Sequence, residues 1–365
     1  MTAGGRRTGV AHLPLHPGKA PKWLFERMVR LSRGIVTALA EDYGPDIVLD
    51  RMSDPYWFQA LGCILGFDWH SSGVTTTVCG ALKEGLRGLE CELGLFAAGG
   101  KGGTSRKTPS EIDAAGDLLG KDLSHLVYAS RMSAKVDSAA LQDGYQLYHH
   151  TFLFTAAGSW AVVQQGMNET NRYARRYHWL GARVADFVCE PHNAIASQGQ
   201  GPVLNLVARE SDRARDAIAR VASEERPEKV VKELTRIARL DLPPRHHLLR
   251  EDIHPERLEK IFVSTYERKP EDFETLLGMP GIGPKTLRAL SLLSELLYGA
   301  PVSFRDPARY SFAHGGKDGH PYPVERKTYD QTISILETAV RRARVADRER
   351  LDALKRLQAI WDIRG

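Results

Sequence analysis

Residues 273–297 read FETLLGMPGIGPKTLRALSLLSELL, and this stretch decides the fold of the second half of the chain. At its centre stands PGIGPKT, residues 280–286, between two groups of leucines at helical spacing. Gly281 and Gly283 permit a tight turn with positive φ and a close approach of the backbone to a ligand. Proline is favoured at the first position of a helix, where Pro284 stands. The pattern therefore predicts two helices joined by a short turn.

This turn has the chemistry of a phosphate site. A second helix that begins at Pro284 would present backbone N–H groups and the positive end of its dipole beside the turn. A phosphate fits such a site without any contact to a base. We therefore predict a nucleic acid as the partner, bound mainly through its backbone and independently of sequence. DNA is the partner that the resemblance described next implies, with RNA left open. The predicted contacts from this turn are Gly281, Ile282, Gly283 and Thr286.

The stretch resembles a helix-hairpin-helix motif and, beyond it, the motif of helix-hairpin-helix DNA glycosylases with lyase activity. The resemblance rests on Gly281, Gly283, Lys285 and Thr286, followed by a helix and by APVSFRD at 300–306. It implies that Lys285 attacks C1′ of a flipped nucleotide to form a Schiff base, and that Asp306 is the activating carboxylate. Asp306 stands three residues further along than that pattern expects. A lysine in such a turn can instead contact phosphate.

Other stretches of the chain carry a resemblance to a second family. The stretches that carry this resemblance are RTGVAHLPLHPGKAPKWLFERM (7–28), SDPYWFQALGCILGFDWHSSG (53–73), AAGGKGGTSRKTP (97–109), LVYASRMSAKVDSAALQDGYQLYHH (126–150) and FRDPARYSFAHGGKDGHPYPV (304–324). They resemble a family of archaea and bacteria that is catalogued as a domain of unknown function, number 763, over nearly the whole chain. That resemblance implies no activity.

The pattern of the remaining sequence predicts two domains in these 365 residues. Residues 1–200 are expected to form an α+β domain with a small β-hairpin or sheet, since Thr151–Thr155 and Trp160–Gln165 flank a turn. Residues 203–365 are expected to form an all-α domain that contains the 273–297 motif. The expected helices of this domain are 203–222, 227–239, 255–265, 271–278, 284–299, 326–344 and 347–361.

Composition limits the class of protein. Hydrophobic residues are 42% of the chain and the formal net charge is +5, as in an ordinary globular protein with a weak preference for polyanions. No apolar run reaches the ~18 residues of a membrane span, and the first 22 residues lack the apolar core of a signal peptide. Four scattered cysteines favour a reducing compartment, so we expect a cytoplasmic protein. The sequence leaves the oligomeric state open.

Basic stretches outside the motif are further candidates for DNA contacts. The glycine-rich segment 99–107 carries Lys101, Arg106 and Lys107 without an acidic residue. Arg175 and Arg176 alternate with aromatic residues between 173 and 179, a composition that suits stacking on unpaired or flipped bases and equally suits an amphipathic helix. Lys317 lies in the long polar loop 301–324, and loops of that length are commonly functional.

A polar cluster before and within the predicted hairpin is the alternative catalytic site. It would be a nuclease site that uses Mg²⁺ or Mn²⁺, with the 273–297 motif as DNA anchor. The glycosylase–lyase hypothesis needs no cofactor and is preferred, in a repair or defence enzyme, and a DNA-binding adaptor without activity is the third possibility. No cysteine and histidine spacing indicates a zinc site. The candidate residues of the nuclease site are Lys135, Asp137, Asp143, His149, His150 and Gln164.

Overall fold

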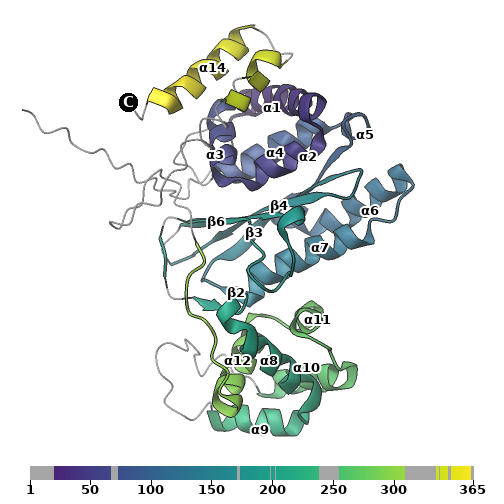
Figure 1. Cartoon of the computed structure of the whole chain (residues 1–365), viewed down its shortest axis with the longest axis vertical. Coiled ribbons are helices and arrows are strands. Elements are labelled where there is room, and N and C mark those ends of the chain that lie inside the picture. Colours follow the sequence, from purple (N-terminus) through teal and green to yellow (C-terminus); the bar gives the residue numbers. More distant parts are fainter. Residues whose placement is uncertain are drawn as a thin grey trace, which may run out of the picture.

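A five-stranded antiparallel sheet crosses the middle of the molecule in the computed structural model (Figure 1). Its strand order is β1-β3-β4-β5-β6. The bounds are β1 Leu95–Lys101, β3 Gln146–Thr155, β4 Trp160–Met167, β5 Ala174–Leu180 and β6 Ala194–Ala196. The structure describes residues 20–66, 73–170, 173–197, 199–201, 203–237, 255–308, 334–336, 338–343 and 347–362.

One face of the sheet is covered by the N-terminal helices, because Leu153, Val163 and Leu180 of the strands share a buried apolar cluster with them. The C-terminal helix α14 (Asp347–Asp362) packs on the outside of this layer (Figure 1). Its Arg356 Nε donates to the carbonyl of Ile64 at 2.8 Å. The other helices of the layer are α1 Lys22–Tyr43, α2 Pro45–Ser53, α3 Pro55–Ile64, α4 Gly73–Leu86 and the short α5 Glu90–Leu93.

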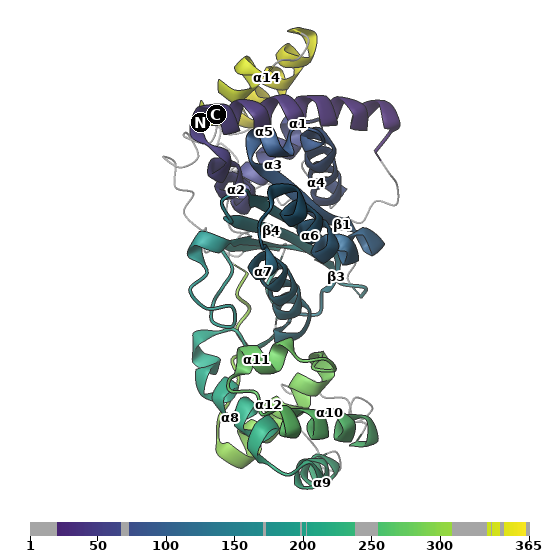
Figure 2. The ribbon, with the colours of Figure 1, turned by 90° about the vertical axis from the view of Figure 1, so that its right-hand side faces the viewer.

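The opposite face of the sheet packs on α6 (Thr108–Leu119) and α7 (Ser124–Lys135), and α7 continues into a π-helical turn over Val136–Ala140. Below α7 stands a second group of helices (Figure 2). One buried apolar cluster runs from this face of the sheet through α7 into that group. The helices of the group are α8 Asp212–Glu224, α9 Pro227–Ile237, α10 Pro255–Arg268, α11 Phe273–Gly278 and α12 Pro284–Tyr298.

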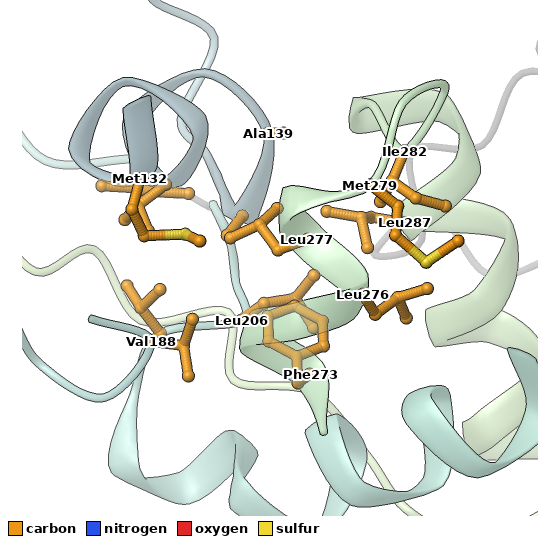
Figure 3. Packing of buried hydrophobic residues seen from close by; sticks show 14 of the residues in the cluster. Met132, Ala139, Val188, Leu206, Phe273, Leu276, Leu277, Met279, Ile282 and Leu287 are labelled. Carbon is orange, nitrogen blue, oxygen red and sulfur yellow. The ribbon is translucent and has the colours of Figure 1, made fainter. Parts of the chain in front are cut away.

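Helix α11 is one of the contacts between the two halves. Figure 3 shows Leu277 of α11 between Met132 of α7 and Leu276, with Phe273 beside Leu206. All of these side chains are buried. The turn that follows α11 is therefore fixed to the end of α7 by apolar packing.

Several predicted elements are confirmed. The hairpin of β3 and β4 is present, and the N-terminal half is α+β. The sheet is larger than a hairpin, since β1, β5 and β6 join it. The predicted helix 203–222 begins later, at Asp212, because Leu204–Asn205 (β7) pairs with Leu141–Gln142 (β2).

The described helices of the predicted second domain, 203–365, pack in two places. Helices α8–α12 pack together, but Ala353 and Leu357 of α14 belong to the buried cluster of the N-terminal layer. Ion pairs of Glu349 with Arg27 and Arg30 of α1 lie along the same contact. Burial of apolar side chains against the distant N-terminal helices therefore determines where α14 packs. No helix among the described residues is long and apolar enough to cross a membrane.

Candidate nucleic-acid interface and polar pocket

The turn between α11 and α12, residues 279–283, has the positive φ that the sequence predicts at Gly281 but not at Gly283. Gly281 has a φ of +85°, which favours glycine, and a Cβ there would lie 3.2 Å from Ile261 Cγ1. Gly283 is the N-cap of α12 with an ordinary φ of −128°, and a Cβ there would meet nothing within 4 Å. Among the described residues, no packing contact requires glycine at 283.

Side chains from the end of α7 and from β2 hold this turn. Lys135 Nζ donates to the carbonyl of Ile282 at 2.5 Å, and burial lowers the pKa of this lysine. Gln142 Nε2 donates to the carbonyl of Pro284 at 2.9 Å, while its Oε1 accepts from Arg288 Nε at 2.6 Å. These bonds fix the turn and the first residues of α12 against the N-terminal half.

Two of the predicted backbone contacts are internal. Ile282 is fully buried, and Thr286 is 3% exposed with its hydroxyl donating to the carbonyl of Gly281 at 3.2 Å. Both residues therefore shape the turn and do not present their side chains to a ligand. Around the start of α12, Gly281, Pro284 and Lys285 are exposed and Gly283 is half-buried.

Lys285 and Asp306 do not form the predicted catalytic pair. Lys285 is exposed in the first turn of α12. Asp306 is 9% exposed, and Arg175 donates to both of its oxygens, at 3.1 and 2.7 Å. The backbone N–H groups of Gly201 and Ala308 complete its bonds. Asp306 is thus bound inside the protein as the partner of an arginine.

Arg175 is the centre of that buried cluster, which corrects its predicted role as a DNA contact. Besides Asp306 it binds Asp143 Oδ2 at 3.0 Å, and its guanidinium lies over the ring of Tyr145 at 4.6 Å. Burial acts to lower the pKa of Arg175, but the neighbouring carboxylates outweigh it and raise the pKa. Tyr177 also donates to Asp143 at 2.7 Å. The arginine is 2% exposed, so it stabilises the fold from within.

Arg176 is buried on the opposite face of the sheet. Because it is not exposed, its predicted role as a DNA contact is corrected as well. It donates to the amide oxygen of Gln59, to the carbonyl of Pro55 and to Nε2 of His178. Burial lowers its pKa to about 9. Its guanidinium lies over the ring of Phe58 at 4.4 Å. The aromatic and arginine residues of β5 are core residues of a strand covered on both faces.

The predicted nuclease residues do not converge on one site. His149 and His150 are consecutive in β3, so they lie on opposite faces of the sheet. His149 bonds Thr151, and burial with positive neighbours lowers its pKa to about 3. Asp143 belongs to the cluster around Arg175, and Lys135 binds the 279–283 turn. His150, Gln164 and Asp137 remain together, on the face toward α7.

Those three residues form a chain of buried hydrogen bonds. His150 forms a hydrogen bond through one ring nitrogen to the Ser130 hydroxyl at 2.9 Å. Its other ring nitrogen forms a hydrogen bond to Gln164 Oε1 at 3.0 Å. Burial lowers the pKa of His150. Gln164 Nε2 donates to Asp137 Oδ2 at 2.6 Å, and Asp137 is fully buried. The chain therefore leads from α7 across the sheet to a single carboxylate.

The chain ends at His192, which the sequence analysis missed. Its Nε2 lies 2.5 Å from Asp137 Oδ1, and Trp179 Nε1 donates to the other oxygen at 3.0 Å. His192 lines a pocket of about 750 Å³ between the segment around β6 and residues 305–308. No spacing signal points to it, because Asp137 is 55 residues away and the surrounding sequence is a loop.

The remaining basic candidates are placed as follows. Lys101 ends β1, and Arg106 and Lys107 stand in a 3-10 segment, Gly102–Lys107, where all three side chains are exposed. They stay available to a ligand. Lys317 lies outside the described residues. Among the described residues, no group of three or more histidine, cysteine, aspartate or glutamate side chains could hold a metal ion.

Comparison with protein families gives one match. Residues 9–324 match the model of the family described as "Protein of unknown function (DUF763)". The chain belongs to this family. No curated protein and no solved structure matches this DUF763 protein. The 279–283 turn, the Arg175 cluster and the His192 pocket all lie within the matched residues, so they are features of the family region of the chain.

Proposed function

We propose that this DUF763 protein binds the phosphate backbone of DNA through the 279–283 turn and the start of α12, as a helix-hairpin-helix motif. The observation that carries the proposal is Gly283, which has an ordinary backbone conformation and open space where a Cβ would stand. An N-cap of this kind lets a phosphate reach the first N–H groups of α12 and the positive end of its dipole.

The surroundings of the turn support this role. Lys285 is exposed beside Gly283 and adds a positive charge. Lys135 and Gln142 bind the carbonyls of Ile282 and Pro284, so the turn is held in shape before a ligand arrives. Phosphate contacts of this kind carry no sequence information, and we expect binding that weakens steeply with salt.

In this proposal Lys285 contacts phosphate. The Schiff-base hypothesis requires a neutral amine beside an activating carboxylate. Asp306 is instead bound to Arg175, and Lys285 is exposed. The position of the lysine therefore favours a charged contact with the backbone.

The test is the affinity for a labelled duplex over a series of salt concentrations. Gly283→Val should fold normally and weaken binding by about tenfold, because the new side chain keeps a phosphate from hydrogen bonds to the helix end. Gly199→Val is the matched control, since a Cβ at 199 also meets nothing within 4 Å. Lys285→Ala should weaken binding and reduce the salt slope by about one, whereas Lys22→Ala on α1 should not. Wild-type affinity in both hairpin variants would refute the proposal.

A further inference from the structure

His192 lines the pocket beside Asp306, and a hydrogen bond to Asp137 fixes the orientation of its imidazole. His192 Nε2 donates to Asp137 Oδ1, so the neutral ring has its free electron pair on Nδ1. Asp137 is fully buried and also accepts from Trp179 and Gln164, and three N–H donors suit a carboxylate. A carboxylate that holds a histidine in one tautomer is the arrangement of a general base.

The charge around the pocket selects the kind of ligand. Among the residues that the structure describes, the charged side chains that line it are the carboxylates of Glu190, Glu210 and Asp306 and the guanidinium of Arg305. Each of these carboxylates has an arginine partner. Arg175 binds Asp306, Arg305 lies 3.8 Å from Glu210 and Arg209 lies 3.7 Å from Glu190. This balanced lining favours an uncharged polar ligand. The pairs of Glu190 and Glu210 are exposed, so their carboxylates can also stabilise positive charge that develops on a ligand.

The polar lining and the size fit a nucleoside. The amides of Asn193, Gln200 and Asn205 add hydrogen-bond donors and acceptors to the carboxylates. A volume of about 750 Å³ lies within the range of small-molecule sites. Glu190, at the edge of the pocket, has a φ of +47°, and a strained backbone of this kind is common at functional sites.

We propose that this pocket accepts one unpaired nucleoside of a nucleic acid and hydrolyses its N-glycosidic bond, with His192 as general base and Asp137 as its positioning residue. The proposal rests on the proposed DNA binding for delivery of the substrate. A water molecule loses a proton to His192 Nδ1, and its oxygen forms a bond to C1′. The C1′–N bond breaks with its electron pair moving to the base, which takes a proton from solvent. The nearby carboxylates stabilise the positive charge that develops on the sugar.

This mechanism differs from the Schiff-base hypothesis in the residue and in the intermediate. No covalent bond forms between protein and DNA. The reaction needs only water as co-reactant, and Lys285 has no part in the chemical step. The two mechanisms therefore predict opposite results in a trapping experiment.

The test measures free base released from oligonucleotides that carry normal, deaminated or oxidised bases, single-stranded or opposite each partner, by mass spectrometry in the presence of EDTA. His192→Gln should lower the rate of release by at least about 100-fold, the low end for a general base. Exposed His125 of α7 gives the matched control, His125→Gln, which should keep the rate. Added imidazole should restore part of the activity of His192→Ala, an effect that a purely structural histidine would not show.

Two further measurements keep the proposal falsifiable. Glu210→Gln changes a carboxylate whose side chain is 59% exposed, so it should fold and slow release by about tenfold or more. Free nucleosides are tested in parallel, so that the pocket is probed without DNA binding. DNA binding that is intact with no base released from any substrate overturns this proposal and leaves the proposed function standing. Nucleoside cleavage without DNA binding supports the pocket and overturns the proposed function.

Discussion

Arg175 is buried between the carboxylates of Asp143 and Asp306, and it ties β5 to two distant segments of the chain. Replacing it with methionine leaves both carboxylates buried without their cation. We expect Arg175→Met to lower the free energy of unfolding by roughly 3–5 kcal/mol. Urea denaturation measures this loss, and adding Asp306→Asn to the variant should recover part of it. A loss below about 1 kcal/mol, as for a surface pair, would contradict the prediction.

Lys285 gives the second prediction at this scale. If it contacts phosphate, borohydride treatment of a mixture with abasic-site DNA should trap no covalent complex that depends on this lysine. The physical reason is its exposed position without the carboxylate of Asp306, which Arg175 binds. A trapped band in the wild type that disappears in Lys285→Ala would restore the Schiff-base mechanism. Gel mobility after denaturation separates the two outcomes.

At the scale of residues, the side-chain pairs that define the candidate site could not be predicted from the sequence. Arg175 and Asp306 are 131 positions apart, and His192 and Asp137 are 55 apart. Only the folded sheet brings each pair together. By contrast, Gly281 was predictable, because a turn with positive φ is a local property of the chain.

At the scale of elements, local patterns predicted the helices well and the strands less well. The ends of α11 and α12 follow the apolar spacing and Pro284. Strand β5 was missed, since all seven of its residues are buried between two helical layers. A strand covered on both faces loses the alternation of polar and apolar residues that identifies it. Arg175 and Arg176 of this strand were therefore predicted to lie on the surface, whereas the structure buries them in the core.

The turn between α11 and α12 supplies the prediction at this scale. Gly281→Ala and Gly299→Ala both place a side chain at positive φ, which costs about 1–2 kcal/mol. At Gly299 the new Cβ meets nothing within 4 Å, whereas at Gly281 it also presses on Ile261. We expect Gly281→Ala to destabilise the protein more in urea denaturation and to weaken DNA binding, and Gly299→Ala to leave binding unchanged. Equal effects on stability and on affinity would show that the turn is not specially shaped.

At the scale of the whole molecule, burial on both faces of the sheet makes stability depend on pH. His149 and His178 lie toward the N-terminal helices and His150 toward α7, and all three are buried. Burial lowers the pKa of each, to about 3 for His149 and well below the ordinary value of 6.5 for His178. The unfolded chain therefore binds protons near pH 6 that the folded protein does not.

The sign of the effect follows from those lowered pKa values. Above pH ~7 the three histidines are neutral in both states and contribute no slope. As the pH falls below ~6.5, the free energy of unfolding should fall by up to about 1.4 kcal/mol per pH unit for each histidine. Urea denaturation at a series of pH values between 8 and 5 measures this slope, with the region above pH 7 as internal reference. Because His149 Nδ1 has no hydrogen-bond partner, His149→Gln should fold and reduce the slope by about one proton. A flat profile down to pH 5 would mean that these histidines are charged in the fold, and that the layers around the sheet admit water.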